Sequence, residues 1–564
     1  MVENTLINSV PVVLDRDVVQ PALREILVTQ GSRHVRRFHP VAALLVSGIG
    51  AIVAAQLAAA DWLSLHGWIS TYFGYAILIC IACRHSPKTS MCLGFFFGFM
   101  SMATSFWWAE QMLAYSLNTQ GIVPKAVFVG LILWESIPFA VFTYLIANLR
   151  RAQPSSLGLL VPISVWILFG IFWPRVFTWE IGHTQLACLP LAQIADLGGG
   201  PIITWVVLWC AAIPQLLFDW KFASNAQRQK NATWGAALVA IMLLSDLSYG
   251  FYQLSRWSNK METSPIYTIG CIQENPADVT SIARLRAATN KLEDNLDVIC
   301  WPESTLGTHS LNLESFRDLL EVARASLPPV VDTTDLLGLP APLIVGGKSF
   351  SGPKNEDAPY QQTAFLVDST GNVLSHYHKR GLMPLGEYVP GEQYFPKLHE
   401  WFQLGNYFIP GVEDKPVSMP DGTKLGVLIC YEDISPDIVR RTCLAGAEAF
   451  ICIINASAFE QPIALYQHLR LAQLRTIENR RYLVRIAGTG ISCTIKPTGE
   501  MIQMVAPYES ASFVAKIHRF EDQTYYSHFG NGMFWLCATI VAVFGVGKYR
   551  RPKSLSIAGV GHRG

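Results

Sequence analysis

Eight apolar segments, each close to the length that crosses a lipid bilayer, constrain the fold of this 564-residue chain more than any other feature. A transmembrane helix needs about 20 apolar residues. Half of the chain (51%) is hydrophobic and only 15% is charged, which is typical of a polytopic α-helical membrane bundle with a soluble part attached. The expected spans are residues 41–60, 66–83, 91–109, 122–148, 157–173, 201–219, 233–252 and 530–547.

The segment between the fifth and sixth spans differs from the others. Residues 174–200 are apolar, but Pro174, Pro190 and the run Gly198–Gly200 interrupt them. Proline and glycine disfavour a continuous helix. We therefore expect an interfacial or re-entrant stretch here.

Basic residues cluster at alternate ends of the spans. They precede the first span and follow the second, fourth, sixth and eighth, at Arg33, Arg36, Arg37, Arg84, Lys88, Arg150, Arg151, Lys221, Arg228, Lys230, Lys548, Arg550, Arg551 and Lys553. Short loops rich in Lys and Arg stay in the cytoplasm. Both termini are therefore expected in the cytoplasm, and the long loop after the seventh span on the outer face.

These patterns divide the chain into five expected parts. Residues 1–40 are polar and do not resemble a signal peptide, because the apolar run begins too late. The parts are a cytoplasmic tail (1–40), a transmembrane domain of about seven spans (41–252), an extracytoplasmic domain (253–529), a final span (530–547) and a basic cytoplasmic tail (548–564).

The extracytoplasmic region alternates short apolar strand patterns with helical ones, which indicates a layered α/β domain. Strands are expected at 266–272, 296–301, 342–349, 362–367, 372–378, 425–430, 449–454, 482–487 and 491–495. Helices are expected at 277–295, 312–326, 435–446 and 463–480, and surface loops at 327–341 and 351–360.

Composition also excludes several classes of function. The net charge of +1 gives no basic field for nucleic acid. The chain has no zinc-type Cys pairs and no phosphate-binding loop, and His376 and His378 lack a third ligand, so we expect no metal and no cofactor. The cysteines of the soluble region are expected to be buried apolar side chains except Cys430; they are Cys271, Cys300, Cys430, Cys443, Cys452 and Cys493.

Three short motifs carry the chemistry of the soluble region. They are Trp301–Glu303, His378–Gly381 running into Pro384–Pro390, and Leu428–Glu432. Each places a reactive group directly after an apolar strand pattern: a carboxylate, an ammonium and a thiol. A base, an oxyanion stabiliser and a nucleophile are the groups that acyl chemistry requires.

Each of the three residues also has a plain structural reading. Cys430 could be a core residue, but a thiol at a strand-to-helix turn faces helix N-terminal amides, which favour a thiolate nucleophile. Glu303 could cap a helix, or it could act as the general base. Lys379 could be a solvated lysine, or a fixed cation that faces the oxyanion.

Further residues beside the motifs are candidates for support. Glu387 can orient Lys379 or Glu303, and Glu432 and Tyr431 can support the same network. Tryptophans at the expected outer ends of spans form either an aromatic belt or the wall of a lipid-entry cleft; they are Trp107, Trp108, Trp173 and Trp179.

The three motifs resemble the carbon–nitrogen hydrolase (nitrilase) superfamily, whose Glu–Lys–Cys triad matches Glu303, Lys379 and Cys430 in order and local motif. With the flanking spans, residues 41–545 resemble the apolipoprotein N-acyltransferase family. The resemblance implies an αββα sandwich on about eight spans, in a multi-pass protein of the bacterial inner membrane, with the catalytic domain on the periplasmic face.

The resemblance also implies a reaction. Cys430 would take an acyl chain from a phospholipid as a thioester and pass it to the α-amine of a diacylglyceryl-cysteine lipoprotein. The expected partners are thus a phospholipid donor and a lipoprotein acceptor, with no nucleic acid, and the chain is expected to be a monomer.

One departure from the family pattern leaves alternatives open. The family typically reads Asn-Asp-x-Trp-Phe where this chain has Asn455-Ala456-Ser457-Ala458-Phe459. The same triad with water as the second nucleophile would make a membrane-anchored amidase or nitrilase of a small amide. A non-enzymatic envelope scaffold is a third alternative. The identity of the acceptor stays open, as does the choice between transfer and hydrolysis.

Overall fold

The computed structural model describes residues 40–152, 157–274, 280–293, 295–303, 305–306, 310–311, 338–350, 360–402 and 408–545. Residues 40–50 belong to a separate unit, and the remainder form one compact unit. The expected helix at 312–326 and most of the expected loops lie outside the described residues.

All eight apolar segments are helical. The helices are α2 (Pro40–Ala60), α3 (Ser70–Arg84), α4 (Pro87–Ser105), α6 (Ile122–Ala152), α7 (Leu157–Phe172), α9 (Ala195–Ala211) with α10 (Ile213–Lys221), α11 (Ala226–Thr263) and α18 (Gly532–Ile540) with η4 (Val541–Gly545). By length and composition, three of the described helices can cross a membrane, or four if the bent pair of α4 and α5 (Ala109–Ser116) is one span. The other apolar helices are too short to meet this requirement, so the structure supports three or four of the eight expected spans.

The stretch expected to be re-entrant is irregular. It contains η1 (Ile181–Ala187) and α8 (Leu189–Ala192), and it enters α9 through a kink at Gly198 and Gly199. Gly199 has a φ of +70°, and a Cβ added there would lie 2.6 Å from the Tyr526 ring. Glycine is therefore required at the kink by both conformation and space.

The soluble region is a two-sheet sandwich. One sheet has the order β13-β1-β2-β4-β5-β6, with β3 paired to β4, and the other has the order β12-β11-β10-β9-β8-β7. Strand bounds in the first sheet are β1 Ile266–Gln273, β2 Val298–Cys300, β3 Ser310–Leu311, β4 Leu343–Phe350, β5 Tyr360–Val367, β6 Val373–His378 and β13 Ala511–His518. In the second sheet they are β7 Val417–Ser418, β8 Lys424–Ile429, β9 Ala449–Ile454, β10 Leu483–Ala487, β11 Ser492–Ile495 and β12 Met501–Val505.

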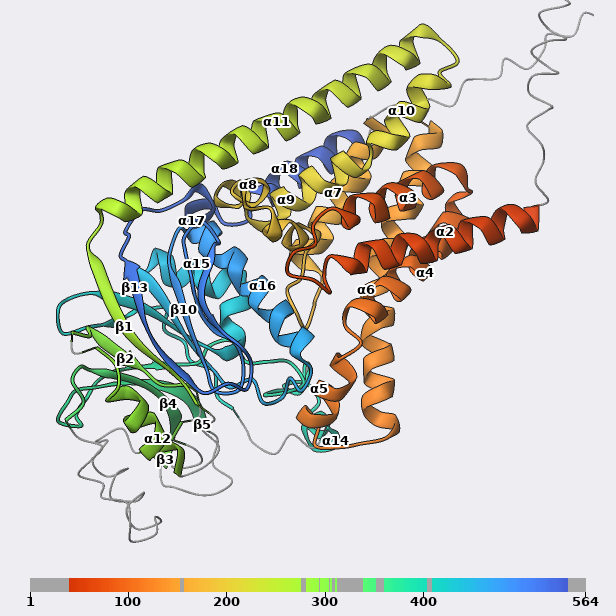
Figure 1. Ribbon diagram of the computed structural model, residues 1–564. Coiled ribbons are helices and arrows are strands. Elements are labelled where there is room, and N and C mark those ends of the chain that lie inside the picture. Colours follow the sequence, from red (N-terminus) through yellow and green to blue (C-terminus); the bar gives the residue numbers. More distant parts are fainter. Residues whose placement is uncertain are drawn as a thin grey trace, which may run out of the picture. The chain divides into compact units, whose positions relative to one another are not determined.

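Three apolar layers hold this sandwich together. Side chains such as Ile269 and Val298 from the first sheet meet Val427 and Ile451 from the second in a common core. The outer face of the first sheet packs on α12 (Thr280–Thr289), and that of the second on α16 (Pro462–Asn479) beside α15 (Pro436–Leu444) (Figure 1). The expected order of layers, helix–sheet–sheet–helix, is confirmed.

Several elements differ from the sequence expectation. Helix α11 continues eleven residues beyond 252, so it ends just before β1. Strands β12 and β13 were not expected, because their side chains are largely half-exposed and form no continuous apolar run. The short strands β3 and β7 and the short helices α14 (Lys397–Trp401) and α17 (Tyr525–Phe529) also carry no strong sequence signal.

A buried ion pair joins the sandwich to the irregular stretch. The Arg480 guanidinium donates to Asp196 Oδ2 at 2.6 and 3.0 Å and to Gln193 Oε1 at 2.7 Å. Arg480 and Asp196 are only 1% and 4% exposed. Removing one partner of such a pair leaves an uncompensated buried charge.

We therefore expect Arg480→Ala to destabilise the protein by about 3–5 kcal/mol. Thermal unfolding in detergent checks this. Lys496→Ala is the control, because Lys496 makes only a partly exposed i,i+4 pair with Glu500 and should change stability little. Equal melting temperatures for the two variants would contradict the assignment of Arg480 as the link.

Candidate functional site

The three residues expected to carry the chemistry lie at the carboxyl ends of three strands. Glu303 follows β2, Lys379 follows β6 and Cys430 follows β8. The side chains meet in the buried interior: Lys379 and Glu303 are 1% and 4% exposed, and Cys430 is half-buried. Residues distant in the sequence thus converge at one point of the sandwich.

The Lys379 ammonium is held by two carboxylates. Its Nζ lies 2.6 Å from Glu387 Oε1 and 3.9 Å from Glu303 Oε1. Burial alone would lower the pKa of Lys379, but Glu387 and Glu303 outweigh it and raise the pKa above its usual value. Lys379 is therefore a permanent cation, and Glu387 is its nearer partner.

The second oxygen of Glu303 is fixed by the chain that follows β9. The backbone N–H of Asn455 donates to Glu303 Oε2 at 2.7 Å. Burial raises the pKa of Glu303 to about 7, against the lowering effects of Lys379, the Asn455 N–H and a hydrogen bond from the Cys430 thiol. A carboxyl group with a pKa near neutrality can both accept and return a proton at physiological pH.

Cys430 opens a tight turn, η3 (Cys430–Ile434), with a φ of +52°. Such a conformation is costly for a residue other than glycine and is found where a site requires it. The expected stabilisation of a thiolate by helix amides is wrong: burial, and then Glu303, raise the pKa of Cys430 well above its usual value. The resting thiol is protonated, so it needs a base to become a nucleophile.

Glu432 links the Cys430 turn to the Lys379 loop. Its fully buried carboxylate accepts from the backbone N–H groups of Ile429, Arg380 and Gly381 at 2.7–3.0 Å and from the Tyr377 hydroxyl at 2.8 Å. Tyr377 and Arg380 lie on either side of Lys379 in the chain, and Ile429 directly precedes Cys430. Glu432 therefore positions both side chains through the residues beside them.

Tyr431 connects the site to the segment between the apolar helices. Its hydroxyl donates to the carbonyl of Val176, and its ring lies 6.4 Å from that of Phe177. The Thr178 hydroxyl donates to the Ile434 carbonyl at 2.8 Å. We call residues 174–180 the strap, because they are fixed to the Cys430 turn at both ends of η3.

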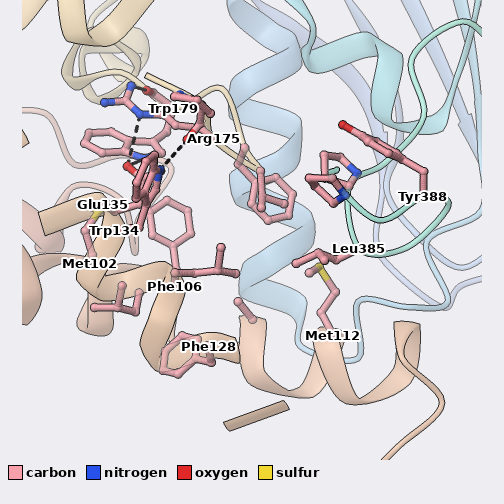
Figure 2. A pocket seen from close by; sticks show the side chains of 18 residues that line it. Met102, Phe106, Met112, Phe128, Trp134, Glu135, Arg175, Trp179, Leu385 and Tyr388 are labelled. Carbon is pink, nitrogen blue, oxygen red and sulfur yellow. Dashed lines mark hydrogen bonds and ion pairs between the residues drawn. The ribbon is translucent and has the colours of Figure 1, made fainter. Parts of the chain in front are cut away.

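An apolar cavity of about 350 Å³ lies between the strap, the apolar helices and the loop Pro384–Pro390, which we call the Glu387 loop (Figure 2). Pro384, Leu385, Tyr388 and Pro390 line it from the loop. The other lining residues are Met102, Phe106, Ala109, Met112, Phe128, Leu131, Ile132, Trp134, Glu135, Pro174, Arg175, Val176, Phe177 and Trp179. The dimensions and the apolar lining suit a hydrocarbon chain.

The candidate tryptophans separate into different environments. Trp179 lines the cavity, and Trp173 stacks on Trp134, another lining residue, at 4.3 Å. Trp108 is buried and donates to Gln467 Oε1 at 2.9 Å, whereas Trp107 is exposed. The interpretation as the wall of a cleft therefore applies to Trp179 and not to Trp107 or Trp108, which do not line the cavity.

Other sequence candidates are also placed. The His378 ring nitrogen lies 2.9 Å from the Thr363 hydroxyl, and among the described residues no group of three or more His, Cys, Asp or Glu side chains could hold a metal ion. Of the six soluble-region cysteines only Cys430 is partly exposed, so the buried reading of the other five is confirmed.

Two features of the site were missed by sequence reasoning. The backbone of Asn455 donates to Glu303, and its carbonyl lies 3.8 Å from Cys430 Sγ. Buried Asp433, inside the Cys430 turn, accepts from His468 and Arg485, each at 2.7 Å. A backbone contact leaves no sequence signal, but a second carboxylate directly after Glu432 in the Cys430 motif did offer one.

Replacing Glu432 by Gln should loosen the site. Whichever way the amide is oriented, its NH₂ group faces backbone N–H donors that now lack an acceptor. We expect a loss of about 2–3 kcal/mol in unfolding free energy, together with faster amide hydrogen exchange at residues 380–390. Glu448→Gln is the matched control, because Glu448 accepts one exposed bond, from Lys424. Unchanged exchange at 380–390 would contradict the linking role.

Comparison with known proteins places these features in a family. Residues 224–519, a little over half of the chain, match the family model for carbon–nitrogen hydrolases. Residues 50–213 match the model for the N-terminal domain of apolipoprotein N-acyltransferase. The first match covers the sandwich together with α11, and the second covers the apolar helices from α2 to α9.

Two relatives agree with this assignment. The chain is 25% identical to the apolipoprotein N-acyltransferase of Geobacter metallireducens, over 85% of this chain and 91% of the relative. It is 27% identical to that of Bdellovibrio bacteriovorus, over 79% and 85%. Among solved structures, a mutant amidase from Nesterenkonia sp. AN1 is 19% identical, with a TM-score of 0.33 over 45% of this chain and 90% of the amidase.

The resemblance that the motifs suggested is therefore confirmed. Both family models match, and the relatives cover most of the chain. The chain belongs to the apolipoprotein N-acyltransferase family of the carbon–nitrogen hydrolase superfamily.

Proposed function

We propose that this protein transfers a fatty acyl chain from a phospholipid, through a thioester on Cys430, to the N-terminal amine of a diacylglyceryl-cysteine lipoprotein. One observation carries the proposal. The half-buried Cys430 thiol and the buried Glu303 and Lys379 side chains come together next to Glu387. The neighbours of Glu387 in its loop line an apolar cavity of about 350 Å³. The relatives named apolipoprotein N-acyltransferase support the choice of substrates.

In the first step Glu303 acts as the general base. It takes the proton of the Cys430 thiol as sulfur attacks the ester carbonyl of the phospholipid. Lys379 stabilises the developing oxyanion, a contribution of about 3–4 kcal/mol for one fixed donor. When the tetrahedral intermediate collapses, Glu303 returns the proton to the departing glycerol oxygen, which leaves a lysophospholipid and an acyl-Cys430 thioester.

In the second step the same groups act on the lipoprotein amine. Glu303 takes a proton as the amine attacks the thioester carbonyl, and Lys379 again faces the oxyanion. Cys430 then leaves as a thiolate and recovers its proton from Glu303. Glu387 keeps Lys379 in place at 2.6 Å during both steps, and Glu432 and Tyr431 hold the Cys430 turn.

We propose the membrane arrangement that the charge pattern predicts. The eight apolar helical segments span the inner membrane, both termini lie in the cytoplasm, and residues 253–529 form the catalytic domain on the periplasmic face. The strap and the Glu387 loop would then meet the outer leaflet, where a phospholipid ester can reach Cys430. All proposed catalytic groups come from one chain, so a monomer suffices.

Hydrolysis of a small amide, the alternative, is less supported. The cavity beside the site is lined mainly by apolar side chains, and a small polar amide gains little from such a lining. The segment that departs from the family pattern still supplies the Asn455 backbone contact to Glu303. The missing Asp and Trp side chains therefore do not remove this contact.

A two-step labelling experiment tests the function. Purified protein incubated with phospholipid should gain a hydroxylamine-sensitive acyl group that a diacylglyceryl-cysteine peptide removes with formation of the N-acyl product. Cys430→Ala should show no label. An acyl label that water removes as fast as the peptide does, or ammonia release from simple amides without phospholipid, would favour the hydrolase instead.

The rate of thioester formation should depend on the ionisation of Glu303. Because burial raises the pKa of Glu303 to about 7, the carboxylate that serves as base is lost as the pH falls through that value. We expect the rate to fall about ten-fold for each pH unit below 7 and to level off above it. Single-turnover rates measured across this range check the prediction. A rate that stays constant from pH 5 to pH 8 would exclude Glu303 as the base.

A further inference from the structure

One ion pair interrupts the otherwise apolar lining of the cavity. Arg175 Nε, on the strap, lies 3.2 Å from Glu135 Oε2, on α6. The two side chains are 5% and 13% exposed. Glu135 and Arg175 are the only charged residues among the described residues that line this cavity. A buried charge pair in a hydrocarbon-like wall is costly unless it is well held.

Trp179 holds this pair in a fixed geometry. Its indole N–H donates to Glu135 Oε2 at 3.2 Å, and its carbonyl accepts from Arg175 Nη1 at 2.8 Å. The Arg175 guanidinium also lies 4.4 Å from the centre of the Trp179 ring. Next to it, Trp134 donates to the Pro174 carbonyl at 2.9 Å. The charged end of the cavity is therefore a rigid wall.

The wall lies opposite the reactive end of the cavity. Figure 2 shows Glu135, Arg175, Trp134 and Trp179 together at one end, and Leu385 and Tyr388 at the other. The latter end belongs to the loop whose Glu387 binds Lys379. An acyl chain with its carbonyl near Cys430 would therefore extend through the cavity with its terminal methyl group directed toward the ion pair.

We infer that the Glu135–Arg175 pair sets the upper limit on acyl-chain length. This inference rests on the proposed acyl transfer. A methylene group that reaches the pair must either displace a hydrogen-bonded charge or pack against it, and neither replaces the bonds that would be lost. Chains that stop short of the pair meet only apolar walls. The pair thus acts as a specificity determinant and takes no part in the chemistry.

The test compares phospholipid donors whose saturated acyl chains differ by two carbons. Thioester formation on the full-length wild-type protein should be uniform up to a limiting length and then fall about ten-fold or more at the next donor. The variant Glu135→Leu/Arg175→Met removes both charges and replaces the Arg175 side chain on the strap by a shorter one. We expect it to accept at least the next longer donor.

The control is a second buried ion pair, outside the cavity lining. Arg150 and Asp219 form such a pair, so Arg150→Met/Asp219→Leu tests the general effect of removing buried charges and should keep the wild-type length limit. For each variant, the rate with one donor is compared with the rate with the other donors. A lower amount of folded protein lowers all of these rates equally, so it does not change the length limit. If the first variant does not fold, Glu135→Gln/Arg175→Met keeps an acceptor for Trp179 and should give the same shift.

The outcomes separate the two proposals. Absence of a Cys430 thioester with every donor in the wild-type protein would overturn the acyl transfer itself. If the thioester forms and its length limit is the same in wild type and in the cavity variant, the role of the Glu135–Arg175 pair in setting that limit is overturned. The proposed acyl transfer is then unaffected. A limit that moves equally in the Arg150/Asp219 control would also overturn it, because the effect would not belong to the cavity wall.

Discussion

The burial of one ammonium group between two carboxylates is the constraint around which the site is organised. Lys379 is 1% exposed, and its charge is tolerated because Glu387 lies 2.6 Å away and Glu303 3.9 Å away. The pair with Glu387 keeps the lysine charged. The more distant Glu303 is left with a pKa of about 7, so it can exchange protons. Cation and base are thus products of the same three-membered cluster.

The strap gives this cluster its connection to the apolar helices. The Val176 carbonyl accepts from Tyr431 and the Thr178 hydroxyl donates to Ile434, near the two ends of the Cys430 turn. Arg175, in the same segment, lines the cavity. One short segment therefore contacts both the Cys430 turn and the cavity. Such coupling suits a reaction in which a thiol must meet an ester at the surface of a bilayer.

Much of this could be predicted from local sequence patterns. The apolar runs predicted the eight apolar helical segments, and continuous apolar strands such as Ala449–Ile454 were predicted because both of their faces are buried. Strands β12 and β13 were not, because half-exposed strands leave a weak pattern. Glu303, Lys379 and Cys430 were predicted because reactive side chains follow apolar strands in motifs with few structural explanations.

The amino-acid sequence by itself determined the family, the apolar segments and the three reactive side chains, since each is expressed in contiguous residues. Only the tertiary structure decided that the Cys430 thiol is protonated, that Glu387 and not Glu303 is the close partner of Lys379, and that the Asn455 backbone binds Glu303. Protonation depends on burial and on charges brought together from distant strands. No local pattern contains that information, because desolvation and Coulomb interactions are properties of the packed site.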